Sequence, residues 1–105
     1  MRKVAIIGAS GLLGRAVASE LAKVPDRQVV QTAHRRADAG RVPLNIRDHD
    51  AIGAFLRAKS PDAVVVTAAE RRPDVCENDP ALFRALNVDA LSAIAGEARQ
   101  SGAWV

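Results

Sequence analysis

Short apolar runs alternate along this chain with segments whose apolar residues recur at helical spacing. The run from Lys3 to Ile7 ends at a glycine and is typical of a parallel strand that is buried on both faces. Residues 28–33 predict a second strand, with Val29 and Val30 at its centre, and Pro25-Asp26 ends the segment before it. Between the two runs, apolar residues recur every four positions and predict one face of an amphipathic helix: Leu13, Val17 and Leu21.

The middle of the chain continues the alternation. Residues 42–46 predict a short third strand, and Pro43 places it at a sheet edge because proline cannot donate a ladder hydrogen bond. Asp48 is a suitable N-cap for a helix, which must end by Ser60 because Pro61 disfavours helical geometry in the residue before it. The inner face of this predicted helix consists of apolar residues: Ala51, Ile52, Phe55 and Leu56.

The last third of the chain predicts one more strand and one long helix. Residues 63–67 form a strand of the fully buried kind. Asp79-Pro80 begins a helix, with an acceptor at the N-cap and proline at the first helical position, and Gly102 ends it after about Gln100. Residues 103–105 resemble the first residues of a fifth strand. The buried face of the long helix is expected at Leu82, Leu86, Ala90 and Ile94.

This order of elements predicts an α/β fold of the Rossmann type. Strands that alternate with helices form a parallel sheet with right-handed crossovers and helices on both faces. We expect the strand order 3-2-1-4-5, truncated at the start of strand 5. Residues 1–105 are then the N-terminal part of one NAD(P)-binding domain, without a second domain.

Composition narrows the possible functions. The chain has 105 residues, of which 49% are hydrophobic, so it can bury a core. Cys76 is the single cysteine, which excludes an internal disulfide, offers no metal cluster and fits a reducing, cytoplasmic setting. Neither a signal peptide nor a membrane span is expected from the apolar runs. The formal net charge is +3, but the basic residues are not interleaved with aromatics, which weakens a nucleic-acid interpretation.

The glycine-rich segment 8–14 is the strongest chemical signal. It follows the first strand directly and opens the first helix, the context that dinucleotide binding requires. Gly8 allows the tight turn, Gly11 leaves room for a pyrophosphate near the backbone, and Gly14 lets the helix pack closely on the sheet. Helix N-terminal N–H groups would then face the phosphates. Further contacts are expected from neighbouring residues of the same turn: Ser10, Leu12 and Leu13.

The end of the second strand indicates which dinucleotide is bound. NAD sites usually carry an acidic residue there, which accepts a hydrogen bond from the ribose 2′-hydroxyl. This chain has His34, Arg35 and Arg36 instead. A guanidinium pairs with a 2′-phosphate, so the pattern favours NADP(H) over NAD(H). The alternative is that Arg35 and Arg36 are two solvated loop residues without a role in binding. His34 is either close to the adenosine or a solvated loop residue.

Three segments together resemble a known protein family. Residues 8–17, 65–75 and 86–90 are similar to the extended short-chain dehydrogenases/reductases, in the group that contains dTDP-4-dehydrorhamnose reductase and the regulatory beta subunit of methionine adenosyltransferase. The spacing G-x-x-G-x-x-G is typical of this superfamily. The resemblance covers essentially the whole chain, and residues 69–74 look more like the regulatory subunit than the reductase.

The resemblance implies roles for further residues. Asn45 and Ile46 match the pair that flanks the adenine, although many family members have Asp in place of Asn45. Ala68 and Ala69 match the small residues that line the nicotinamide ribose, and Glu70 follows them as another candidate contact. Asn87 matches a helix asparagine that supports the active-site water network, or it is only a tolerated polar residue on a long helix.

The resemblance also implies a reaction and the residues that carry it out. The family transfers a hydride to a carbonyl, with a Tyr as general acid and a Lys that lowers its pKa. The chain contains no tyrosine and no Tyr-x-x-x-Lys motif, so no catalytic residue is assigned to it. Three possibilities follow: the NADP(H)-binding segment of a nucleotide-sugar reductase, a non-catalytic regulatory protein that binds a partner enzyme, or an inactive fragment.

Overall fold

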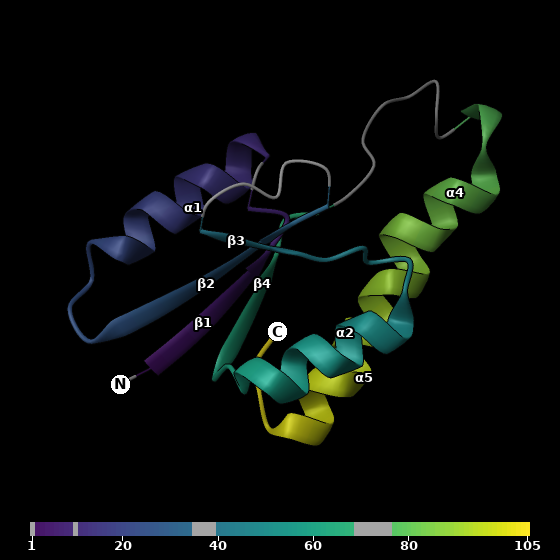
Figure 1. Ribbon diagram of the computed structural model, residues 1–105. Coiled ribbons are helices and arrows are strands. Elements are labelled where there is room, and N and C mark those ends of the chain that lie inside the picture. Colours follow the sequence, from purple (N-terminus) through teal and green to yellow (C-terminus); the bar gives the residue numbers. More distant parts are fainter. Residues whose placement is uncertain (1, 10, 35–39, 69–76) are drawn as a thin grey trace.

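A computed structural model describes residues 2–9, 11–34, 40–68 and 77–105 as a four-stranded sheet with helices on both faces (Figure 1). The strands are β1 (Arg2–Ile7), β2 (Arg27–Ala33), β3 (Arg41–Pro43) and β4 (Ala63–Val66). The helices are α1 (Leu12–Ala22), α2 (His49–Lys59), α4 (Pro80–Arg84), the π-helical turn η1 (Ala85–Asp89) and α5 (Ala90–Ser101).

All strands of the sheet are parallel, in the order β3-β2-β1-β4. Ile7, the last residue of β1, pairs with Thr32 on one side and with Val66 on the other. The carboxyl ends of β2, β1 and β4 therefore lie level with one another, and the segments that follow them begin at one edge of the sheet. This order confirms the predicted arrangement of the first four strands.

The predicted fifth strand is represented by one backbone bridge. Trp104 pairs with Ala63 in parallel, and its N–H donates to the Asp62 carbonyl at 3.0 Å. No fifth strand is present among the described residues. In the described part of the chain, only this bridge covers the outer edge of β4, so that Val64 is the one buried residue of the strand and its other residues are half-buried. The prediction that this strand is fully buried was wrong for that reason.

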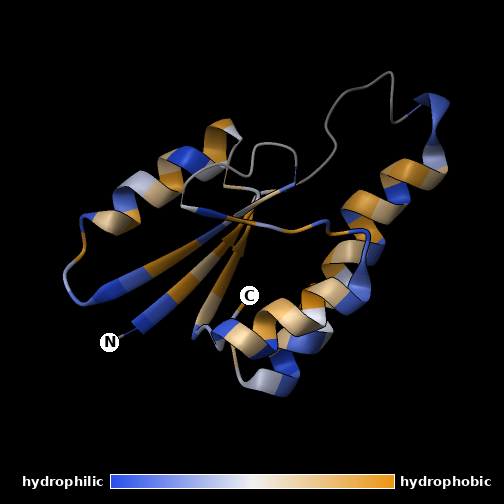
Figure 2. Cartoon of the chain, viewed as in Figure 1, coloured by the Kyte–Doolittle hydropathy of each residue, from blue (hydrophilic) through white to orange (hydrophobic). Residues whose placement is uncertain are grey.

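Two apolar clusters, one on each face, hold the layers together. Ile6, Ala9 and Ala18 form the cluster beneath α1. The larger cluster joins the other face to α2 and α5 and includes Ile7 and Ile94. Along β1 the hydrophilic residues lie at the amino end and the apolar residues follow toward the carboxyl end (Figure 2). Ile6 belongs to one cluster and Ile7 to the other, so successive residues of β1 face opposite sides of the sheet. This confirms that the strand is buried on both faces.

The predicted face of the first helix was wrong by one position at its start. Leu13 is 56% exposed, whereas Gly14 and Ala18 are buried, with Val17 and Leu21 beside them. The helix lies closest to the sheet at Gly14, so this glycine, and not Leu13, lies on the face that contacts the sheet. Apolar periodicity could not show this, because glycine does not count as an apolar position.

The helix ends follow the predicted capping residues. Asp48 caps α2 by accepting from the Ala51 N–H at 3.1 Å, and the helix ends at Ser60 in the left-handed conformation, directly before Pro61. Asp79 caps α4 in the same way, accepting from the Leu82 N–H at 3.0 Å. Gly102, with φ of +76°, ends α5.

The long helix predicted from Asp79 to about Gln100 is not one regular α-helix. The π-helical turn η1 interrupts it between α4 and α5. Ala90, Ile94 and Ala98 are buried against α2 and the sheet, as the pattern predicted for Ala90 and Ile94, while Leu86 is only half-buried. The third strand is also shorter than predicted: it ends at Pro43, although the Leu44 N–H still donates to the Ala33 carbonyl at 3.0 Å.

Candidate functional site

The residues that the sequence singled out gather at the carboxyl edge of the sheet. Gly8 follows β1, His34 follows β2, and Ala68 lies just beyond β4. Asn45 and Ile46 lie after β3, and Asn87 is in η1. Five predicted contacts fall outside the described residues and stay predictions: Ser10, Arg35, Arg36, Ala69 and Glu70.

The three glycines of the turn occupy three different environments. Gly8 has φ of +95°, and a Cβ atom on it would lie 2.6 Å from the Ala68 backbone nitrogen. A Cβ on Gly14 would lie 2.2 Å from the Gly8 carbonyl oxygen, so the helix can approach the turn only because this residue has no side chain. Among the described residues, a Cβ on Gly11 would meet only the Gly8 oxygen, at 3.6 Å. Gly8 and Gly14 are therefore required by backbone geometry, whereas Gly11 leaves the surface of the turn open.

The N-terminus of α1 differs from those of α2 and α4. Its N-cap is Gly11, which has no side chain to accept a hydrogen bond, and its first turn contains no acidic residue. Asp48 and Asp79 place a carboxylate at the other two starts. The first N–H groups of a helix carry a partial positive charge and need acceptors. Among the described residues, no side chain accepts from the start of α1, and an anion is the ligand that suits such a helix start best.

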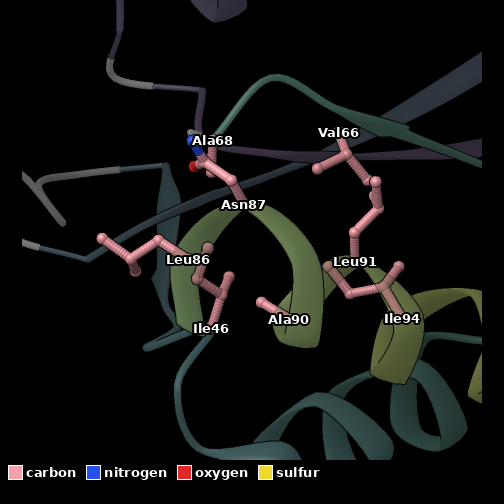
Figure 3. Close-up of a pocket in the computed structure, with 8 residues that line it drawn as sticks. All are labelled: Ile46, Val66, Ala68, Leu86, Asn87, Ala90, Leu91 and Ile94. Carbon is pink, nitrogen blue, oxygen red and sulfur yellow. The ribbon is translucent and has the colours of Figure 1, made fainter. Parts of the chain in front are cut away.

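A mostly apolar pocket of about 260 Å³ opens next to the glycine turn. Ala68 belongs to both features, since it touches Gly8 and lines the pocket. Ile46 and Leu86 contribute apolar wall, and Asn87 is the polar residue of the lining (Figure 3). In Figure 3 the amide of Asn87 lies beside Ala68, at the end of the pocket nearest the turn. A flat apolar group of the size of a purine ring would suit walls of this kind.

Asn45 and His34 lie at the border of this region rather than inside it. Asn45 is exposed, and its Oδ1 accepts from the Arg47 N–H at 3.0 Å, which fixes the turn that leads into α2. Its neighbour Ile46 is buried and lines the pocket. His34 is exposed at the end of β2. The structure therefore brings Ile46, Ala68 and Asn87 together around one pocket, with Asn45 and His34 outside its lining.

The sequence-based predictions overlooked two threonines. Thr67, directly after β4, has its hydroxyl 3.0 Å from the Gly8 carbonyl oxygen. Thr32 is 1% exposed near the end of β2, and its carbonyl accepts from the Ala9 N–H at 2.8 Å. The sequence does show a threonine near the end of each of the two strands that flank β1. Hydrophobic patterning could not identify these residues as important, because it considers only apolar positions.

The described residues form neither a metal cluster nor a membrane-spanning helix. In the described part of the chain, no three His, Cys, Asp or Glu side chains are grouped so that they could hold a metal ion. Within the same ranges, no helix combines the length and the apolar character needed to cross a membrane.

A parallel sheet in this order, with a glycine turn leading from its central strand into α1, defines a Rossmann-type nucleotide-binding fold. Comparison with known sequences identifies the family. The chain matches the RmlD substrate binding domain over residues 1–105, and it belongs to this family.

Individual relatives fall into two groups. The chain is 40% identical to the methionine adenosyltransferase 2 subunit beta of Pongo abelii over 99% of its length and 31% of that protein. It is 36% identical to the solved dTDP-4-dehydrorhamnose reductase of Yersinia enterocolitica, with a TM-score of 0.82, over 99% of this chain and 33% of the other. The reductase of Bacillus anthracis, solved in complex with NADP, shares the fold alone, at 19% identity and a TM-score of 0.80, over 98% of this chain and 34% of the other. The chain spans about a third of the length of these relatives.

Proposed function

We propose that this chain binds NADP(H), with the pyrophosphate over the glycine turn and the adenine in the adjoining pocket. The single observation that carries the proposal is the start of α1 at Gly11, which no side chain in the described part of the chain caps. A dianionic pyrophosphate supplies the acceptors that these N–H groups need, and it is favoured by the positive end of the helix. Ala68 connects this position to the pocket, so that one elongated ligand can occupy both.

The preference for the phosphate-bearing cofactor rests on sequence. Arg35 and Arg36 follow β2, where a carboxylate would repel a 2′-phosphate and a guanidinium would pair with it. A charge-assisted hydrogen bond contributes about 1.5–3 kcal/mol, which corresponds to roughly 10- to 150-fold in affinity. The fold itself accommodates either dinucleotide, so we assign the preference for NADP(H) to these two residues.

Titration of the purified chain with NADPH and NADH, followed by fluorescence, tests this preference. The wild-type chain should bind NADPH at least tenfold more tightly, and the double variant Arg35→Ala/Arg36→Ala should bind both cofactors with similar, weak affinity. Arg2 and Arg27 offer a matched control, because they pair in register at the opposite end of the sheet. Arg2→Ala/Arg27→Ala removes the same charge and should leave the preference intact. Equal affinity of the wild-type chain for both cofactors would refute the role of Arg35 and Arg36.

For the complete protein, we propose hydride transfer to the carbonyl of a nucleotide-linked sugar, as the similarity to dTDP-4-dehydrorhamnose reductase implies. These 105 residues contain no tyrosine, so a catalytic tyrosine would have to come from another part of that protein. NADPH-dependent turnover of dTDP-4-dehydrorhamnose by the complete protein tests this role. A protein that binds NADPH and shows no turnover would contradict it.

A second candidate function is regulatory binding to a partner enzyme. It is favoured by the 40% identity over nearly the whole chain to a subunit named for methionine adenosyltransferase. In that case the cofactor site is kept and the surface of the complete protein contacts the enzyme. Co-purification of the complete protein with a methionine adenosyltransferase, together with a change in that enzyme's activity, would support this function over the reductase.

A further inference from the structure

The peptide group between Gly8 and Ala9 is held at both ends by neighbouring strands. Its N–H, on Ala9, donates to the Thr32 carbonyl of β2 at 2.8 Å. Its carbonyl, on Gly8, lies 3.0 Å from the hydroxyl of Thr67, which follows β4. Because the N–H and C=O of a peptide are fixed in one plane, these two bonds together set the rotation of that plane.

Thr67 binds the end of β1 through more than its side chain. Its backbone N–H donates to the Ile7 carbonyl at 2.9 Å, and the Ala68 N–H donates to the same oxygen at 3.1 Å. The Thr67 hydroxyl is 3.1 Å from the Ile7 oxygen as well as 3.0 Å from that of Gly8. A threonine hydroxyl has one hydrogen, so it is shared between these two acceptors. The hydroxyl thus joins two successive carbonyls just where the strand becomes the turn.

The position of the Gly8 oxygen matters for the start of α1. It is the atom that a Cβ on Gly14 would strike at 2.2 Å, and it accepts from the Gly11 N–H at 3.3 Å. A different rotation of the Gly8–Ala9 peptide would therefore move this oxygen relative to the first turn of the helix. Gly8, with φ of +95°, has no side chain that restricts such a rotation, so the restriction must come from neighbouring groups.

We infer that Thr67 is a positioning residue, which holds the glycine turn in the shape that receives the pyrophosphate. It acts through the Gly8 carbonyl and need not touch the ligand. Thr32 supports it from the other side: its hydroxyl, 3.2 Å from the Ile6 carbonyl, fixes the strand from which its own carbonyl reaches the Ala9 N–H. The effect on affinity rests on the proposed dinucleotide function, whereas the effect on the turn does not.

The test compares Thr67→Val, which keeps the branched shape and strand preference but removes the donor, with Thr67→Ser, which keeps the hydroxyl. Amide hydrogen exchange measures the turn directly. In Thr67→Val, the Ala9 and Gly11 amides should exchange about two- to tenfold faster, after the change in global stability has been taken into account. The same variant should bind NADPH about two- to tenfold more weakly. Thr67→Ser should restore both values to within about twofold of wild type.

Val65→Ala provides the control for a merely structural effect. Val65 is half-buried on β4, the strand that Thr67 follows, and packs against the cluster beneath α1, and it has no hydroxyl that could contact the Gly8 carbonyl. This variant should lower the unfolding midpoint and leave the relative exchange of the turn amides and the affinity for NADPH unchanged.

The outcomes separate the two proposals. Unchanged turn exchange in Thr67→Val would overturn the positioning role, whatever the affinities are. Faster turn exchange in a protein that does not bind NADPH even as wild type would support the positioning role and refute the proposed function. Faster exchange in Thr67→Ser to the same extent as in Thr67→Val would also overturn the role, because the hydroxyl would then not be responsible.

Discussion

Replacement of Gly14 by alanine is the perturbation for which the structure gives the clearest magnitude. The added Cβ would lie 2.2 Å from the Gly8 oxygen, 2.8 Å from the Ala9 Cα and 2.8 Å from the Thr67 Oγ1. Ordinary carbon–oxygen contacts are about 3.3 Å or longer, so α1 would have to move by about 1 Å. Two of the three atoms belong to the backbone and cannot rotate away, and the movement would open the turn that we assign to the pyrophosphate.

The expected loss of stability follows from two opposing effects. Overpacking costs about 1–3 kcal/mol, and alanine regains about 1 kcal/mol of helix propensity over glycine. Because the clash involves backbone, we expect a net loss of about 1–2 kcal/mol, or roughly 5–15 °C in the unfolding midpoint of a domain of this size. NADPH affinity should fall at least tenfold, because the helix start and the turn separate.

Thermal unfolding and NADPH titration of Gly14→Ala, with Gly96→Ala as the matched control, measure these effects. Gly96 lies within α5 and is exposed, and a Cβ on it would meet no atom of the described part of the chain within 4 Å. That control should gain about 0.5–1 kcal/mol from helix propensity alone. Gly14→Ala with the midpoint and affinity of the wild-type chain would refute the close packing of α1 on the turn.

Two further predictions concern the framework. Asp48→Ala removes the N-cap of α2 and should lower the free energy of unfolding, measured in urea, by about 0.5–2 kcal/mol. Asp50→Ala, in the first turn of the same helix, removes no capping bond and should cost less. Equal costs for the two variants would contradict the capping role of Asp48. Thr32→Val should cost about 0.5–1.5 kcal/mol, because the buried hydroxyl donates to the Ile6 carbonyl; unchanged urea unfolding would show that this hydrogen bond contributes nothing net.

Local patterns in the sequence were sufficient for most of the framework. The carboxylates of Asp48 and Asp79 and the glycine at 102 determine helix ends through contacts within a few residues, so their roles could be predicted without a tertiary structure. The order of the first four strands followed from the alternation of strands and helices, since parallel connections have one preferred hand.

What the sequence did not predict depends on contacts between distant segments. Leu13 fits the helical period but is exposed, because the approach of α1 is set by Gly14 against Gly8. The π-helical turn η1 interrupts a segment whose apolar period continues through it, so the pattern contained no sign of it. The role of Thr67 requires knowing that β4 lies beside β1, a neighbour nearly 60 residues away along the chain.

The central claim is that a dinucleotide binds across the glycine turn and the adjoining pocket. The most direct measurement is a series of ¹H–¹⁵N correlation spectra of the labelled chain during NADPH titration. The largest shifts should fall on the amides of Ala9, Gly11, Leu12 and Leu13 and on the pocket residues Ile46 and Ala68, while Arg2, Asp62 and Gly102 at the opposite end of the sheet stay unchanged. Shifts concentrated at that opposite end, or no shifts at millimolar NADPH, would contradict it.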